Sequence, residues 1–179
     1  MRTPSKLQIG GAHLAVAQGD VVDRGAVESA VRGNEAVVCA LGASSLLKRD
    51  TALVVGMHNI LLTMELEGVS RLSYLSADTV RDARDQLNPL RKVFVPLIFR
   101  SSSADHELIE AMIKSSRLDW SIVRPPMLTN EAPTGHYRSG KHLQASSIIP
   151  RLSRADLASF MLEELNDGSL VHEAVEVMP

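Results

Sequence analysis

Tyr137 and Lys141 have the four-residue spacing of a side-chain acid–base pair. Such a pair works when both side chains lie on the same face of a helix, where the lysine lowers the pKa of the tyrosine. Gly135 and Gly140 bracket this stretch, and the residues between them show no helical period. We therefore predict that Tyr137 and Lys141 do not act as a catalytic pair.

The histidines and the single cysteine give no catalytic or metal-binding motif. The six histidines are scattered, and His136 and His142 alone do not make a metal site, so no metal is predicted. Cys39 lies in an apolar run without positive neighbours, which indicates a buried, unreactive thiol. No nucleophile-elbow motif points to a serine hydrolase.

Residues 119–128, with the sequence D-W-S-I-V-R-P-P-M-L, predict the strand around which the chain is organised. The run contains Ser121 and Arg124 and stops at Pro125 and Pro126, because proline has no N–H for a strand ladder. A helical pattern precedes it, which favours a strand in a parallel sheet. In open α/β sheets ligands bind beyond the carboxyl ends of the strands, so the site is expected there.

Strand and helix patterns alternate along the chain. Strands are predicted at residues 13–17, 36–42, 71–76 and 119–124, with short strands near 136–138 and 147–152 and an edge strand at 171–178. Helices are predicted from Asp23 to Gly33, from Asp50 or Thr51 to Gly68, over 105–115, and after a capping box at Ser153 and Asp156. Residues 36–42 lack alternation, which predicts a strand buried on both faces. The order predicts an α/β fold with a Rossmann-type, doubly wound, mostly parallel sheet and helices on both faces.

Composition bounds the class of protein. The chain has 179 residues, 45% of them hydrophobic, which suits one domain over residues 1–179 with one sizeable core. A net charge of −2 gives no basic footprint for nucleic acid. The longest apolar run, residues 94–99, contains Pro96 and is far shorter than the ~20 residues of a membrane span. We expect a cytoplasmic protein, monomeric or weakly homo-oligomeric.

An ordered set of short motifs resembles a known family. The motifs are G-D-V, A-L-G, Y-L-S-A, A-D-H-E-L-I-E, W-S-I-V-R-P-P and T-G-H-Y. Together they resemble the small atypical short-chain dehydrogenases/reductases of the NmrA-like, NAD(P)H-binding family, whose best-known branch is flavin reductase/biliverdin-IXβ reductase. The resemblance covers essentially the whole chain. It implies NADP or NAD as cofactor and a flavin as a candidate substrate.

The same resemblance predicts a missing segment. Such proteins begin with a strand, a G-x-x-G-x-x-G loop, a helix and a second strand, and M-R-T-P-S-K-L resembles the residues that come after that second strand. The glycine loop lets backbone N–H groups approach the pyrophosphate, and Gly10 and Gly11 lack the surrounding strand and helix. A unit of about 30 residues is therefore expected to be absent. Either the start was assigned too far downstream, or the short chain is genuine.

The resemblance also implies roles for individual residues. Ser76 would hydrogen-bond the reacting carbonyl, and His106 would donate a proton or orient the nicotinamide ribose, so both are implied catalytic residues. The implied cofactor contacts are Arg2, Ser5 and Lys6 at the 2′-phosphate of NADP, Asp20 and Val21 at the adenine, Leu41 and Gly42 at the ribose, and Tyr74, Ala77, Pro125, Pro126, Met127 and Leu128 at the nicotinamide.

Each implied residue also has an ordinary structural explanation. Arg2, Ser5 and Lys6 can be a frayed basic terminus, Asp20 a turn cap, and His106 a surface histidine at a helix start. Residues 82–103 are expected to form a lid, an oligomer contact or an ordinary surface helix.

The predicted activity follows from the missing acid–base pair. Hydride transfer to a flat conjugated acceptor requires mainly stacking and orientation, because the cofactors carry the reaction. The sequence therefore predicts an NAD(P)H-dependent oxidoreductase that transfers a hydride to a flavin- or quinone-like acceptor. Two alternatives stay open: a non-catalytic, NmrA-like dinucleotide-sensing or regulatory protein, and an inactive truncated member of the family.

Overall fold

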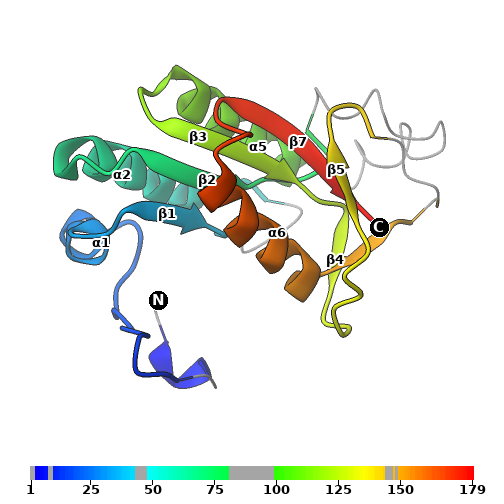
Figure 1. Cartoon of the computed structure of the whole chain (residues 1–179). Helices are drawn as coiled ribbons and strands as arrows, with labels where there is room; N and C mark the ends of the chain where they lie inside the picture. The colour runs from blue at the N-terminus through cyan, green and yellow to red at the C-terminus, as the bar shows by residue number, and fades with distance from the viewer. Residues whose placement is uncertain (1–2, 8–9, 43–47, 81–98, 144–146, 148) are drawn as a thin grey trace.

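The structure, a computed structural model, describes residues 3–7, 10–42, 48–80, 99–143, 147 and 149–179. Its main sheet has five strands in the order β1-β2-β3-β7-β5 (Figure 1). The strands β1 (Ala36–Cys39), β2 (Arg71–Leu75), β3 (Asp119–Arg124) and β7 (Glu173–Met178) are parallel, and β5 (Arg138–Gly140) is antiparallel to β7. A second sheet pairs β4 (Met127–Thr129) with β6 (Arg151–Ser153) in parallel.

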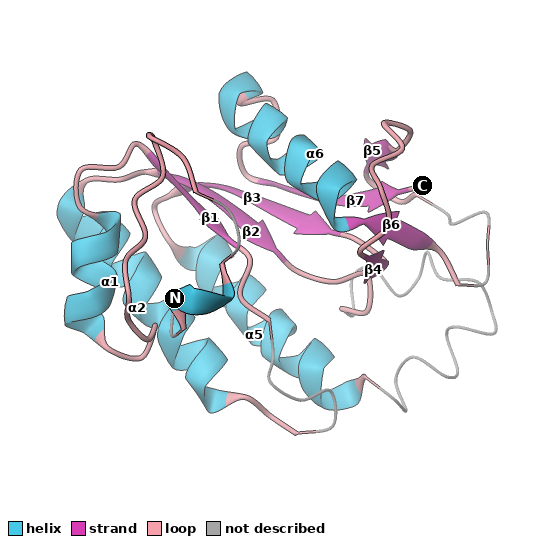
Figure 2. Ribbon diagram, turned by 90° about the horizontal axis from the view of Figure 1, so that it is seen from below, coloured by secondary structure: helices cyan, strands magenta, loops and turns pink. Residues whose placement is uncertain are grey.

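Helices cover both faces of the main sheet. The helices α1 (Arg24–Val31), α2 (Thr51–Glu67) and α5 (Arg100–Ser115) lie on one face, and α6 (Arg154–Asp167) lies on the other (Figure 2). A short 3-10 helix, η1 (Pro4–Lys6), precedes them. The arrangement confirms the predicted Rossmann-type, mostly parallel fold. No helix in the described part of the chain is long and apolar enough to cross a membrane.

The helix ends follow local sequence signals. The side chains of Asp23, Asp50 and Ser153 accept hydrogen bonds from backbone N–H groups in the first turns of α1, α2 and α6. Gly68 and Gly168 end α2 and α6 with φ of 72° and 67°, a left-handed conformation that glycine adopts without strain. The predicted starts of these three helices and the predicted end of α2 at Gly68 are therefore confirmed.

The core lies on both sides of the sheet. On the side of α2 and α5 it contains Met57, Met64, Leu72, Tyr74 and Ile109, and on the side of α6 it contains Val123, Leu152, Leu157, Phe160 and Val175. One close approach ties α2 to the turn before α1. A Cβ atom on Gly56 would lie 2.4 Å from Cγ2 of Val21, so only glycine lets α2 pack this closely against that turn.

Two predictions about the strands are wrong at the start of the sheet. Residues 14–20 form no strand, because no described strand lies beside them to pair with. The strand β1 ends at Cys39, and its side chains are not buried on both faces, because Val38 is exposed while Cys39 is buried. The Val38 side chain, predicted to be buried, is 41% exposed.

Other predictions change at the far end of the sheet. The strand β7 was expected at an edge, but it lies between β3 and β5, because β5 adds to its outer side in the antiparallel sense. The short strands predicted near 136–138 and 147–152 correspond to β5 and β6, each placed slightly later in the chain. The helix α5 starts at Arg100, earlier than the predicted start at residue 105. Most of the region 82–103, predicted as a lid or contact, lies outside the described residues.

Candidate functional site

The carboxyl ends of β1, β2 and β3 meet at one edge of the sheet, because the three strands are parallel. Leu41 and Gly42 follow β1, Ser76 and Ala77 follow β2, and Pro125 follows β3. Two backbone hydrogen bonds extend the pairing past the strand ends, from Ser76 N to Val123 O at 2.8 Å and from Asp78 N to Pro125 O at 3.1 Å. The structure thus gathers these predicted residues at the same edge.

Four of the predicted cofactor residues line a single cavity. Asp20, Val21, Leu41 and Gly42 border a space of about 510 Å³, together with residues of β1 and the start of α2. Asp20 supplies a carboxylate, Val21 and Leu41 supply apolar surface, and Gly42 has no side chain to block a ligand. This combination suits a heterocycle that carries an amino group next to a ribose.

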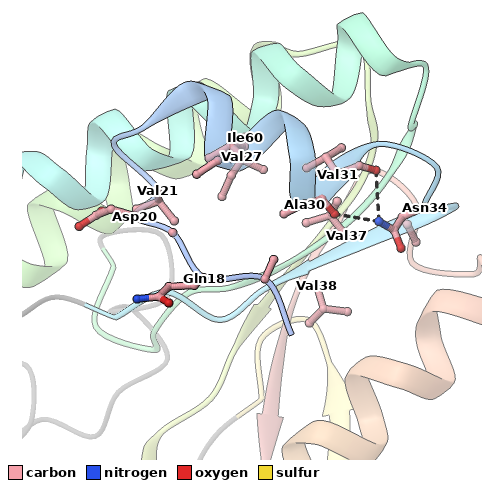
Figure 3. Close-up of a pocket in the computed structure, with 14 residues that line it drawn as sticks. Gln18, Asp20, Val21, Val27, Ala30, Val31, Asn34, Val37, Val38 and Ile60 are labelled. Carbon is pink, nitrogen blue, oxygen red and sulfur yellow. Dashed lines mark hydrogen bonds between the residues drawn. The ribbon is translucent and has the colours of Figure 1, made fainter. Parts of the chain in front are cut away.

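A second cavity adjoins the first between α1 and β1. It has a volume of about 340 Å³ and shares Gly19, Asp20 and Val21 with the larger space. Figure 3 shows Val27 and Val31 of α1 on one side of this cavity and Val37 of β1 on another. It borders an edge of β1 that has no neighbour among the described strands.

Ser76 is bound to a buried ion pair behind the edge. Its hydroxyl donates to Oε1 of Glu110 at 2.7 Å. The guanidinium of Arg124 donates to both carboxylate oxygens of Glu110, with Nε at 3.0 Å from Oε1. Lys114 Nζ lies 3.2 Å from Oε2. Burial alone would raise the pKa of Glu110, but the hydrogen bonds and charge of Arg124, the Ser76 hydroxyl and Lys114 together lower it.

Tyr74 and His106 form a second buried contact, one helical turn away. The Tyr74 hydroxyl lies 2.8 Å from Nδ1 of His106. Burial raises the pKa of Tyr74 above its usual range, and the nearby Cys39 and Glu110 add to this effect. Burial lowers the pKa of His106, although Glu110 and Asp105 pull it the other way. A neutral tyrosine therefore meets a neutral imidazole, and when Tyr74 is the donor, the Nε2 atom of His106 carries the proton.

The segment after β3 is held by a carboxylate of α6. Pro125 and Pro126 are buried, and Met127 and Leu128 form β4. Further along, Asp156 accepts hydrogen bonds from the backbone N–H groups of Thr134 and Gly135, at 3.0 and 2.9 Å.

The hydrogen bonds to Asp156 stabilise its ionised form. The hydrogen bonds from Thr134 and Gly135, together with those from the hydroxyls of Ser153 and Thr134, lower its pKa to about 2. The chain from β3 to β5 is thereby fixed relative to α6.

Other predicted residues are not brought to this edge. Ser5 lies in η1 and lines neither cavity, and Arg2 lies outside the described residues, as does the side chain of Lys6. Tyr137 precedes β5 and donates to Glu163, while Lys141 pairs with Glu173. Because this stretch is a strand and not a helix, the rejection of a Tyr137–Lys141 acid–base pair is confirmed.

Among the residues that the structure describes, no group of three or more potential ligands gathers to hold a metal ion. Cys39 is buried, and burial raises its pKa to about 11, which confirms an unreactive thiol. Two further residues of the site, Glu110 and Asp156, had no role assigned to them from the sequence, although Glu110 ends the A-D-H-E-L-I-E motif and Asp156 belongs to the predicted capping box. The signal that could have found Glu110 is a carboxylate on the buried face of a helix, which must find a partner.

The fold and this edge define a Rossmann-type, dinucleotide-binding class of protein. A family model described as NAD(P)H-binding matches residues 1–168. The chain belongs to this NAD(P)H-binding family, as its motifs implied, and the family's cofactor is NADP or NAD.

Several solved structures share the fold. The oxidoreductase ylbE from Lactococcus lactis has a TM-score of 0.77 at 15% identity, with 99% of this chain and 76% of that chain covered. ChuY from Escherichia coli, described as an anaerobillin reductase, has a TM-score of 0.72 at 21% identity, with 90% and 73% covered. A short-chain dehydrogenase/reductase from Veillonella parvula in complex with NADP has a TM-score of 0.70 at 17% identity, with 89% and 70% covered.

Proposed function

We propose that this protein is an NAD(P)H-dependent reductase that transfers a hydride to a flavin-like or quinone-like acceptor. The observation that carries the proposal is the convergence at one sheet edge of a 510 Å³ cavity, lined by Asp20 and Gly42, with the strand ends that carry Ser76 and Pro125. The cavity suits the adenosine half of the cofactor, because it offers a carboxylate, apolar walls and a position without a side chain.

The bound cofactor supplies the hydride from its reduced nicotinamide ring. The residues of the protein hold the nicotinamide ring and the acceptor in the relative position that hydride transfer requires. Pro125 and Pro126 are buried and rigid, and the segment that follows them is fixed through Asp156. His106, whose pKa is lowered, is neutral near pH 7, so it orients a ligand by a hydrogen bond and does not give up a proton.

The acceptor class follows from the groups at the edge. The described residues offer no tyrosine–lysine pair on a helix that would protonate an isolated ketone. A flat conjugated acceptor takes the hydride without that help, because its ring system spreads the negative charge and its proton can come from water. ChuY, which shares the fold, is described as an anaerobillin reductase, and this description supports a reductase activity.

The preference for NADP is part of the proposal. The family resemblance implies that Arg2, Ser5 and Lys6 meet the 2′-phosphate, although Ser5 lines neither of the two cavities described above. A guanidinium fork suits a phosphate dianion better than a ribose hydroxyl. Measured dissociation constants for NADP⁺ and NAD⁺ test this preference, and equal affinities would contradict it.

The activity is tested by mixing the purified protein with NADPH and, in separate reactions, FMN, riboflavin or menadione. We expect loss of the nicotinamide absorbance that depends on enzyme and acceptor. Asp20→Ala should raise KM for NADPH severalfold, whereas Asp167→Ala, at the end of α6, should leave it unchanged. Tight NADPH binding without oxidation by any acceptor would favour a dinucleotide sensor, and no binding would refute the reductase.

A further inference from the structure

Two buried serines make the same contact on opposite faces of the sheet. Ser76 donates to Oε1 of Glu110 on α5 at 2.7 Å, and Ser121 donates to Oε1 of Glu164 on α6 at 2.7 Å. Each glutamate is also paired with an arginine. Only Ser76 lies at the carboxyl end of its strand, since Ser121 is in the middle of β3. The cluster of Ser121, Glu164 and Arg71 therefore serves as a control for the cluster of Ser76, Glu110 and Arg124, because it has the same contacts away from the edge.

The direction of the Ser76 hydrogen bond is determined by its partner. Glu110 has a lowered pKa and a bidentate contact with Arg124, so it is ionised near pH 7. An ionised carboxylate can only accept hydrogen bonds, so the hydroxyl proton of Ser76 points at Glu110. The Ser76 oxygen is left with acceptor capacity alone.

We propose that Ser76 acts on its ligand as a hydrogen-bond acceptor, so that the group it recognises is an N–H donor and not a carbonyl oxygen. This inference rests on the proposed reductase function and deepens it. Two N–H groups are available in the proposed reaction: the carboxamide of the nicotinamide, and the ring N–H of a flavin-like acceptor. Ser76 is buried, with 5% of its surface exposed at the carboxyl end of β2.

The inference reverses the role that the family resemblance implied for Ser76. A serine that polarises a carbonyl must donate a hydrogen bond to the carbonyl oxygen. To do so, the Ser76 hydroxyl would first have to break its hydrogen bond to Glu110. Turning the proton away from Glu110 gives up a charge-assisted hydrogen bond to a buried carboxylate, which is costly although Arg124 still pairs with that carboxylate. Ser76 therefore positions a ligand and selects for N–H groups, and it does not activate a carbonyl.

The first experiment compares Ser76→Ala with the unaltered protein in binding two cofactors, NADP⁺ and its 3-acetylpyridine analogue. The analogue replaces the carboxamide NH₂ by a methyl group and keeps the carbonyl. If the carboxamide is the donor, Ser76→Ala weakens NADP⁺ binding by about three- to tenfold and leaves analogue binding unchanged.

The second experiment uses saturating NADPH and compares riboflavin, N3-methylriboflavin and menadione as acceptors. If the acceptor ring is the donor, Ser76→Ala raises KM for riboflavin by a similar factor of about three to ten. The methylated flavin and the quinone, which lack that N–H, show no change. Ser76→Thr keeps the hydroxyl and should preserve the preference for the N–H compound in either experiment.

Ser121→Ala is the matched control, because it removes the same kind of hydrogen bond away from the edge and should change neither binding nor KM. Thermal unfolding of both alanine variants separates loss of recognition from loss of fold. An effect of Ser76→Ala of equal size on the compounds with and without N–H, or no effect on any of them, would overturn the inference. Failure of the unaltered protein to bind NADP⁺ would instead refute the reductase proposal on which it rests.

Discussion

Replacing Glu110 by glutamine removes the negative charge that compensates Arg124 inside the protein. Arg124 is 5% exposed and its Nε atom lies 3.0 Å from Glu110. Glutamine keeps the shape of the side chain and one acceptor oxygen, but it puts an NH₂ group where the second acceptor was. The substitution therefore leaves a buried cation with part of its partner missing.

The expected cost depends on the groups that still surround Arg124. Breaking a buried ion pair by removing one partner costs about 3–5 kcal/mol. The carboxylate of Glu176 still lies 3.9 Å from Nη1 of Arg124, and the glutamine oxygen accepts one hydrogen bond, so we expect the lower end, about 3 kcal/mol. For a domain of this size that corresponds to a fall in Tm of about 6–12 °C.

Urea denaturation near neutral pH measures the change in the free energy of unfolding. A cycle with Arg124→Met and the double variant gives the coupling between the two residues. Below the ordinary pKa of 4.5, the unaltered protein should progressively lose the contribution of Glu110, because the folded carboxyl has the lower pKa. The difference between the two proteins should then narrow. A Glu110→Gln variant within about 0.5 kcal/mol of the unaltered protein would refute this account.

Three further outcomes are expected. Tyr74→Phe removes the hydroxyl that lies 2.8 Å from Nδ1 of His106 and should lower the free energy of unfolding by about 1–2 kcal/mol, as measured in urea; unchanged stability would argue against this buried contact. Because the pKa of His106 is lowered from 6.5, the unfolded chain binds more protons, so stability should decline as pH falls below 6.5, and less so in His106→Gln. Asp156→Asn should lower Tm at neutral pH. The unaltered protein should lose stability as pH falls from 3.8 to about 2, because Asp156 takes up a proton more readily in the unfolded chain than in the folded protein. Asp156→Asn should lose less stability over this range, and parallel pH profiles for the two proteins would contradict this.

The parts of the fold that could be predicted are those with local causes. The caps at Asp23, Asp50 and Ser153 and the left-handed Gly68 depend on contacts within a few residues, which the sequence displays directly. The place of β7 in the sheet depends on β5, a three-residue strand whose pairing has no local signal. Residues 14–20 have a strand-like composition, but a strand also requires a neighbour.

The candidate site divides along the same line. Order along the chain was enough to bring Leu41, Ser76 and Pro125 to one edge, because parallel strands share their direction. The partners of these residues could not be predicted in this way. The hydrogen bond from the Ser76 hydroxyl to Glu110 depends on how α5 lies across the sheet. The packing of the helix against the sheet determines that angle.

Gly56 shows how a residue outside a cavity can determine its width. Alanine is normally favoured over glycine inside a helix by about 1 kcal/mol, so Gly56 is an obvious target for anyone wishing to strengthen α2. Here the added methyl group would meet the Val21 side chain at 2.4 Å and push it toward the space that Val21 borders. A routine stabilising substitution at this position would therefore narrow the cavity that we assign to adenine. Engineering of this helix has to begin with Val21.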